Sequence, residues 1–144
     1  MGRKSTDKEI RPLLVSLLRS AQSLHNYTVR SLRNSRLNVP EFEVLTLLLQ
    51  EDGLTLKEVA ERTLIGKTTL TGIADRLEKK GLLKRYNCSE DRRCVRIYLS
   101  RRGHNKVSKL VPRYLEELEN RLQALPTTDI NAAVTVLRQV RDAL

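Results

Sequence analysis

The chain has 144 residues, which is enough for one domain or for one domain with an oligomerising extension. It carries 27 Lys and Arg against 17 Asp and Glu, a net charge of +10, and this excess predicts a polyanionic partner. No apolar run approaches the length that crosses a bilayer, and no apolar segment follows the charged N-terminus, so we expect a cytoplasmic protein without a membrane span or a signal peptide.

The basic charge is unevenly distributed along the chain. Residues 1–40 hold eight basic and two acidic residues, and residues 41–66 hold two basic and six acidic ones. Residues 67–102 hold eleven basic and four acidic residues, whereas residues 103–144 are nearly balanced, with six and five. A solubilising surface would not need this segregation, so we predict one face that meets phosphates.

The first expected element is a long amphipathic helix over residues 8–35. Apolar residues recur along it at spacings of three and four, at Ile10, Leu13, Leu14, Leu17, Leu18, Ala21 and Leu24. Pro12 is tolerated near a first turn, so we expect the regular helix to begin between Ile10 and Pro12. The apolar stripe has no neighbour in the sequence and therefore needs a partner from elsewhere or from another chain.

Two capping boxes follow. Asn38 with Glu41 predicts the start of a helix from Phe42 to about Gln50, which Asp52 and Gly53 end. Thr55 with Glu58 predicts the start of a second, short helix that continues through Arg62.

Residues 66–103 combine a helix with a basic hairpin. Leu70, Ile73, Ala74 and Leu77 share one helix face, and Gly81 provides the left-handed turn that ends a helix. Two strand-like runs, 82–88 and 95–100, flank a short polar segment that bears arginines. A helix-turn-helix followed by such a hairpin predicts a winged helix over residues 38–100, with the helix in one DNA groove and the hairpin on the backbone or in the next groove.

The last third is predicted to be helical again. An apolar repeat of helical period runs over residues 101–125, with a bend expected between Lys109 and Pro112. Pro126 separates it from a final helix capped by Thr127 or Thr128. The expected fold is therefore mainly α with a small β-hairpin, forming one compact domain overall. It is divided into an N-terminal dimerisation helix (1–37), a winged helix-turn-helix (38–103) and C-terminal dimerisation helices (104–144).

The order of elements and several segments resemble the MarR family of bacterial transcription regulators. The matching segments are LNVPEFEVL (37–45), LKEVAERT (56–63), LEKKGLLKR (77–85) and DRRCVRIYLSRRG (91–103). The last segment is similar to the family's wing signature, D-x-R followed by an alternating strand and S/T-x-x-G. The resemblance implies a two-fold homodimer joined by its terminal helices, which binds a pseudo-palindromic double-stranded DNA operator and often represses. Many members release DNA when a small aromatic acid binds or when a cysteine is oxidised.

The resemblance also assigns roles to individual residues. The family's recognition helix corresponds to the segment that holds Lys67, Thr68, Thr69, Thr71 and Arg76. Asp91 and Arg93 occupy the D-x-R positions, where the acid holds the arginine for insertion into the minor groove, whose negative potential attracts it. Arg85, Arg92 and Arg96 are expected phosphate contacts. The alternative is an ordinary exposed ion pair for Asp91 and Arg93, and a solvated helix face for the threonines.

Cys88 and Cys94 flank the five residues of the hairpin tip. They are able to face each other closely enough for a disulfide, and neighbouring arginines would favour thiolates. The family's usual sensing cysteine lies in the N-terminal helix, where this chain has none. The simpler interpretation, two unremarkable strand cysteines, is therefore favoured over a redox pair.

The sequence predicts no enzyme, cofactor or metal site. It has no P-loop, GxSxG, HExxH or dinucleotide fingerprint, and His25 and His104 lack ligands at suitable spacing. A small aromatic or anionic effector would bind between the terminal helices and the winged helix, where Arg19, His25, Tyr27 and Arg30 are polar groups without an assigned role. The alternative to an effector-controlled regulator is an effector-independent basic or architectural DNA-binding module; RNA binding is disfavoured because stacking aromatics are scarce.

Overall fold

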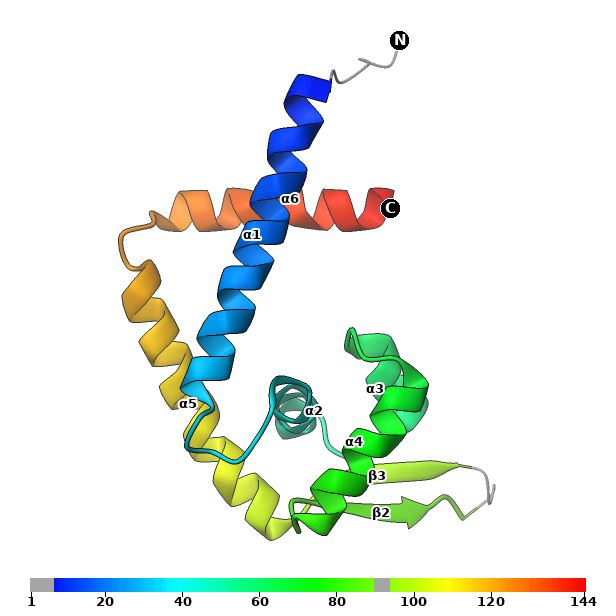
Figure 1. Ribbon diagram of the computed structural model, residues 1–144. Helices are drawn as coiled ribbons and strands as arrows, with labels where there is room; N and C mark the ends of the chain where they lie inside the picture. The colour runs from blue at the N-terminus through cyan, green and yellow to red at the C-terminus, as the bar shows by residue number, and fades with distance from the viewer. Residues whose placement is uncertain (1–6, 90–93) are drawn as a thin grey trace. The chain divides into compact units, whose positions relative to one another are not determined.

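The computed structural model describes residues 7–89 and 94–144 (Figure 1). In chain order its elements are α1 (Asp7–Ser31), α2 (Val39–Gln50), β1 (Leu54–Thr55), α3 (Leu56–Arg62), α4 (Lys67–Lys79), β2 (Leu83–Asn87), β3 (Val95–Leu99), α5 (Arg101–Leu122) and α6 (Thr127–Ala143). The expected class, mainly α with a winged helix-turn-helix, is confirmed. Within the described residues, no helix is long and apolar enough to cross a membrane.

The chain forms two compact units, residues 1–107 and 108–144. The boundary falls inside α5, so the first unit contains α1 to β3 and the first turns of α5, and the second contains the rest of α5 and α6. The three-part division expected from the sequence describes functions rather than compact units, and it remains a proposal.

The core of the first unit is built by helices α2 to α4 and the sheet. The apolar face predicted for α4 is completely buried, and so are two residues of α2. The apolar residues with no exposed surface in this core are Val44, Leu45, Val59, Leu70, Ile73, Ala74, Leu77, Ile97 and Val107. Burying α4 on one face fixes which of its residues remain on the other.

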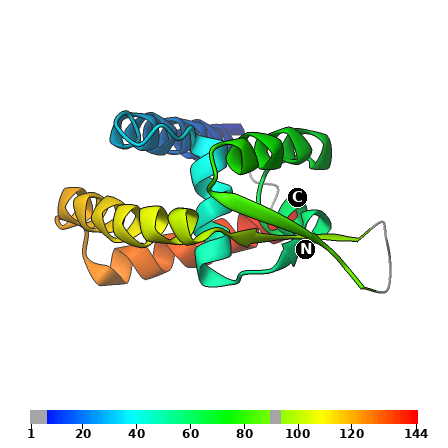
Figure 2. The same cartoon turned by 90° about the horizontal axis from the view of Figure 1, so that it is seen from below.

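The predicted hairpin is part of a three-stranded antiparallel sheet in the order β1-β3-β2. Leu83 pairs with Leu99 and Asn87 with Val95, and in Figure 2 the β2–β3 hairpin runs out past α4. The strand β1 was not predicted. It contains two residues, and Leu54 becomes a strand residue only because it pairs with Ile97 of β3, far along the chain.

Both predicted capping boxes are present. The Asn38 side chain accepts the Glu41 N–H at 2.9 Å, and the Glu41 carboxylate accepts the Asn38 N–H at 3.1 Å. The same exchange joins Thr55 and Glu58, at 3.2 and 2.8 Å. These bonds satisfy N–H groups that a helix start leaves free. The Thr55 N–H and, second, the Thr55 hydroxyl donate to the Glu58 carboxylate and hold its pKa below the usual value, with nearby Arg96 as a lesser cause.

Ser100 and Gly103 join the sheet to α5. The Ser100 hydroxyl donates to the Gly81 carbonyl at 2.6 Å and accepts the Gly103 N–H at 2.9 Å. A Cβ on Gly103 would lie 2.0 Å from the carbonyl oxygen of Leu82, closer than any side chain tolerates. The S-x-x-G part of the wing signature therefore allows the backbone at the start of α5 to approach the backbone at Leu82 closely.

Three helix ends differ from the sequence expectation. α1 begins at Asp7 rather than near Pro12, because the proline removes one hydrogen bond at an exposed end without stopping the helix. α5 continues through Pro112 and ends at Leu122, not Leu125. The expected threonine cap of α6 is wrong: Pro126 occupies the N-cap position, and no side chain caps this helix.

Candidate nucleic-acid interface

The recognition helix α4 presents a polar face opposite its buried one. Lys67, Thr68, Thr69 and Thr71 are all exposed, as the sequence predicts. The Thr71 hydroxyl donates to the Lys67 carbonyl at 3.3 Å and keeps its acceptor capacity and its methyl group. The face thus offers hydroxyls, methyl groups and one cation, which are groups that meet base edges and thymine methyls in a major groove.

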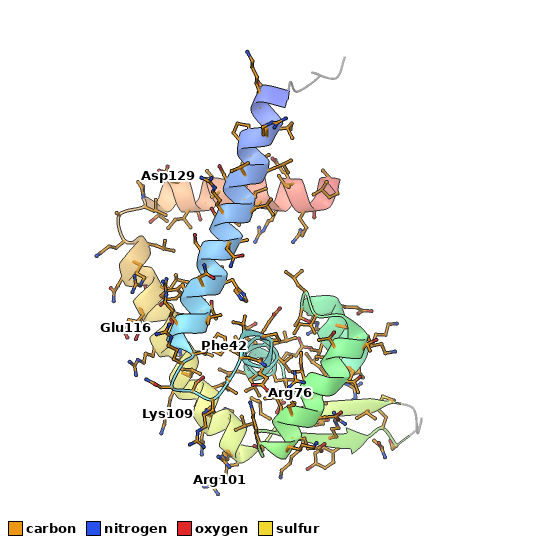
Figure 3. The ribbon with its side chains drawn as sticks, viewed as in Figure 1. Phe42, Arg76, Arg101, Lys109, Glu116 and Asp129 are labelled. Carbon is orange, nitrogen blue, oxygen red and sulfur yellow. A yellow bond between two sulfur atoms is a disulfide. The ribbon has the colours of Figure 1, made fainter. Side chains whose placement is uncertain are left out.

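Arg76 lies on the side of α4 that faces α2 (Figure 3). Its side chain is 52% exposed, and its Nε lies 3.6 Å from Oε1 of Glu41, whose side chain is 1% exposed. Arg76 is therefore tethered at one end to a buried carboxylate while half of its surface is open to solvent. Its expected contact with DNA stays a prediction.

Glu41 connects the start of α2 to the end of α4. Its Oε2 accepts from the Lys80 ammonium at 2.7 Å as well as from the Asn38 backbone. Lys80 also donates to the Arg36 carbonyl at 2.9 Å. The capping box revealed the local role of Glu41, but its pairing with residues about 40 positions later has no local signal in the sequence.

Arg85, an expected phosphate contact on β2, is engaged with α4. Its Nη2 lies 2.6 Å from Oδ1 of Asp75 and 3.4 Å from the Thr71 carbonyl, and its Nε lies 3.8 Å from Oε2 of Glu78. The side chain is 25% exposed. Arg85 therefore braces the hairpin against the recognition helix, and its contact with phosphate stays a prediction.

Arg96, the expected phosphate contact on β3, is also held within the chain. Its Nη1 donates to the Gly53 carbonyl at 2.7 Å and lies 3.7 Å from Oε2 of Glu58. These contacts attach the hairpin to the turn before α3. The other predicted wing residues, Asp91, Arg92 and Arg93, lie outside the described residues, and their roles stay predictions.

The structure corrects our interpretation of the two cysteines. Cys88 and Cys94 form a disulfide, with their Cα atoms 5.3 Å apart. The reason is the register of the hairpin: the residues beyond the last ladder pair, Asn87 and Val95, are brought opposite each other. The Cys88 N–H donates to the Cys94 carbonyl at 2.8 Å, so the two cysteines form a hydrogen-bonded pair that extends the ladder by one step.

A second group of cations lies where α4 ends and α5 begins. Burial, followed by the positive charges of Arg102, Arg36 and Lys80, lowers the pKa of Lys106 below the usual value for a lysine. Lys80 is neutralised by Glu41, but the remaining charges repel one another. This group adds to the basic character of the first unit beyond the residues that the sequence singled out.

Other candidate residues gain no role from the structure. Of the polar groups on α1, Tyr27 is buried, whereas Arg19, His25 and Arg30 are exposed. Across residues 7–89 and 94–144, no three His, Cys, Asp or Glu side chains gather in a way that would hold a metal ion.

Helix α4 follows α3 after a tight turn, buries its apolar face and contacts the β2–β3 hairpin. This arrangement is the winged helix-turn-helix of DNA-binding proteins. The model of the MarR family matches residues 37–95. The transcriptional regulator MhqR of Bacillus subtilis is 24% identical over 135 residues, which cover 94% of this chain and 92% of MhqR. The chain therefore carries a MarR family region over residues 37–95 and resembles a regulator of this type over most of its length.

Solved structures share the fold over almost the whole chain. Bordetella bronchiseptica BpsR, whose DNA binding is regulated by 6-hydroxynicotinic acid, is 27% identical with a TM-score of 0.77, covering 90% of this chain and 98% of BpsR. The MarR family regulator Sco3205 of Streptomyces coelicolor, solved in complex with DNA, has a TM-score of 0.87 at 22% identity, covering 100% of this chain and 92% of Sco3205.

Proposed function

We propose that the protein is a homodimeric, cytoplasmic transcriptional regulator that binds a pseudo-palindromic operator in double-stranded DNA and represses by occupying it. The observation that carries the proposal is α4, whose apolar face is fully buried while Lys67, Thr68, Thr69 and Thr71 are exposed. The match of residues 37–95 to the MarR family and the likeness to a DNA-bound regulator support it. The proposed activity is binding, and no catalytic step belongs to it.

In the proposed complex α4 lies in the major groove and the hairpin reaches the neighbouring backbone or minor groove. The threonines contact base edges, and Arg76 reaches guanine or a phosphate while Glu41 holds its Nε. Arg93 enters the minor groove with Asp91 as its positioning partner, and Arg85, Arg92 and Arg96 contact phosphates. A small aromatic or anionic effector releases the DNA, a control supported by the regulation of BpsR by 6-hydroxynicotinic acid.

Selection of bound sequences from a random double-stranded DNA pool tests the proposal. We expect an inverted repeat whose half-site centres are about 10 base pairs, or one helical turn, apart. An effector-independent architectural module would instead enrich no sequence, and its affinity would follow salt concentration alone.

The double variant Thr69→Ala, Thr71→Ala locates the sequence readout. It should lower affinity for the selected site by roughly 1–3 kcal/mol for each lost base contact while leaving the affinity for unrelated DNA nearly unchanged. Both affinities are measured at one fixed salt concentration. Equal losses on the two kinds of DNA would show that α4 contacts only the backbone.

A further inference from the structure

Leu64 lies in the turn between α3 and α4, and the fold covers none of its side chain. Its exposed fraction is 101%, which only the C-terminal Leu144 equals among the large apolar residues of the described chain. Single exposed leucines are common on protein surfaces. Leu64 differs from them because it lies just before the helix that is proposed to enter the major groove, and because its backbone is fixed.

The turn that carries Leu64 is held on both sides. The Thr63 hydroxyl donates to the Val59 carbonyl at 2.8 Å and accepts the Ile65 N–H at 3.3 Å. The Leu64 N–H donates to Oε1 of Glu43, in α2, at 3.4 Å, and the Ile65 side chain is buried. Since Ile65 is held in the core and the amide of Leu64 is tied to α2, the turn keeps the Leu64 side chain in solvent.

Leu64 shares the start of α4 with side chains that are already candidates for base contacts. Lys67 and Thr68, three and four residues further on, are exposed. Gly66, the N-cap residue, has no side chain, and a Cβ there would meet nothing within 4 Å. This end of the helix is therefore unobstructed, and Leu64 adds a large apolar group to it.

We propose that Leu64 is a specificity-determining residue, which contacts the methyl group of a thymine in each half-site of the operator. This inference rests on the proposed function, because it assigns a base contact within the same complex. In helix-turn-helix proteins the N-terminal end of the recognition helix meets base edges, and a leucine has no hydrogen-bonding group in its side chain with which to read them. The thymine methyl is the apolar group that the bases present in the major groove.

The proposed contact strengthens DNA binding without affecting folding. Leu64 is exposed in the folded and in the unfolded chain, so its apolar surface leaves water only when DNA binds. Removing one methyl group from such a contact should weaken binding about fourfold, a ratio that corresponds to about 0.8 kcal/mol. Removing most of the leucine side chain should weaken binding about tenfold.

Operators in which deoxyuridine replaces thymine test the contact, because deoxyuridine lacks the methyl group and keeps the acceptor oxygens of thymine. Each thymine of the selected operator is replaced in turn in one half-site, and fluorescence anisotropy at a fixed salt concentration gives the dissociation constants. The parent protein should bind about fourfold more weakly when the thymine that Leu64 contacts is replaced. Leu64→Ala should bind the unmodified operator about tenfold more weakly and should lose nothing further at that thymine.

Leu144→Ala is the matched control, because it makes the same substitution at the other leucine that is completely exposed. It should respond to every deoxyuridine replacement as the parent does. Urea denaturation should give Leu64→Ala the same free energy of unfolding as the parent. A weaker affinity of this variant then reports a lost contact with DNA rather than a loss of folded protein.

Three results would overturn the inference. They are a response of Leu64→Ala to every replacement that equals the parent's, an equal loss of affinity on the operator and on unrelated DNA, and an operator affinity of Leu64→Ala as high as the parent's. The last result would leave Leu64 free to meet another protein. Failure of the parent to select any DNA sequence would instead reject the proposed regulator.

Discussion

Glu41 is a buried carboxylate whose partners all come from elements that position the recognition helix. It caps α2 through Asn38, binds Lys80 at 2.7 Å and lies 3.6 Å from Arg76. Since water is excluded from the carboxylate while its basic partners are partly exposed, the group depends on these contacts for compensation. Glu41 therefore joins the start of α2 to the end of α4, the helix proposed to contact DNA.

Replacing this carboxylate by an amide should reduce stability measurably. Glu41→Gln keeps a capping acceptor of the same shape but removes the charge that Lys80 and Arg76 face, and we expect a loss of roughly 1–3 kcal/mol in the free energy of unfolding. Urea denaturation measures it. The control is Glu61→Gln, which breaks the exposed 3.9 Å pair with Lys57 and should cost less than about 0.5 kcal/mol. Similar losses in the two variants would show that burial of Glu41 is unimportant.

The charge of Lys106 lowers the stability of the fold, whereas the charge of Glu41 raises it. Its pKa in the folded protein lies below 10.5 because of burial and then because of Arg102, Arg36 and Lys80. Between the folded pKa and 10.5 the unfolded chain binds more protons than the folded one, so this residue makes stability rise with pH across that window. At neutral pH, where both states are charged, Lys106 destabilises the fold.

The variant Lys106→Gln should consequently be more stable than the parent at neutral pH, and the difference should shrink as the pH approaches 10.5. Urea denaturation of both proteins over this pH range isolates the contribution of Lys106, because every other titratable group is present in both proteins. Lys84→Gln removes a lysine charge at an exposed position on β2 and serves as the control for the loss of charge alone. A constant difference between Lys106→Gln and the parent would contradict the assignment.

At the scale of elements, the sequence predicted those features that are determined by interactions between residues close together in the chain. The two capping boxes, the buried face of α4 and both hairpin strands were readable because their residues interact within one turn or one strand pair. The sequence could not reveal β1 or the partners of Arg85 and Arg96, since these depend on how the fold brings separate elements together. It allowed a disulfide between Cys88 and Cys94 without deciding for it, because spacing alone does not fix the register of the hairpin. The α6 cap failed for a local reason, because Pro126 already occupies the N-cap position.

Substituting Gly103 tests whether the close approach of α5 to the Leu82 backbone requires a glycine. Alanine normally stabilises a helix interior relative to glycine by about 1 kcal/mol. At Gly103, however, the new Cβ would meet the Leu82 carbonyl at 2.0 Å, so Gly103→Ala should destabilise by roughly 1–3 kcal/mol or more. Gly72→Ala in α4 is the matched control, because its Cβ meets only the end of Arg76 at 3.6 Å and should be neutral or stabilising. Thermal unfolding of both variants shows whether the steric clash at Gly103 outweighs the higher helix propensity of alanine.

At the scale of the whole molecule, the terminal helices expose more apolar surface than a folded monomer requires. α6 has 17 residues and buries none of them, yet it bears a stripe of apolar side chains. An isolated helix of this length is only marginally stable in water. The large apolar side chains exposed on the three terminal helices and at their ends are Ile10, Leu14, Val15, Leu18, Leu24, Val29, Leu115, Leu122, Leu125, Ile130, Val134, Val136, Leu137 and Leu144.

The second unit contains an open groove in which apolar side chains of a second copy could pack. It has a volume of about 570 Å³ and is lined mainly by leucines of α5 with Leu125 and Ile130. Burying a leucine or isoleucine side chain contributes about 1.5–3 kcal/mol. A few such side chains of a second copy in this groove would therefore supply much of the free energy that dimerisation needs.

The last prediction concerns this dimer. Sedimentation of the parent protein at micromolar concentration should give twice 16.5 kDa, and Leu137→Glu should dissociate it, because a charge would replace an apolar group of α6. The variant should also lose helical circular dichroism and bind the operator weakly, since one monomer contacts one half-site. Gln139→Glu adds the same charge to the same helix at a polar position and should remain dimeric. A stable, folded parent of 16.5 kDa, or equal behaviour of the two variants, would show that the apolar faces of the terminal helices do not join two copies.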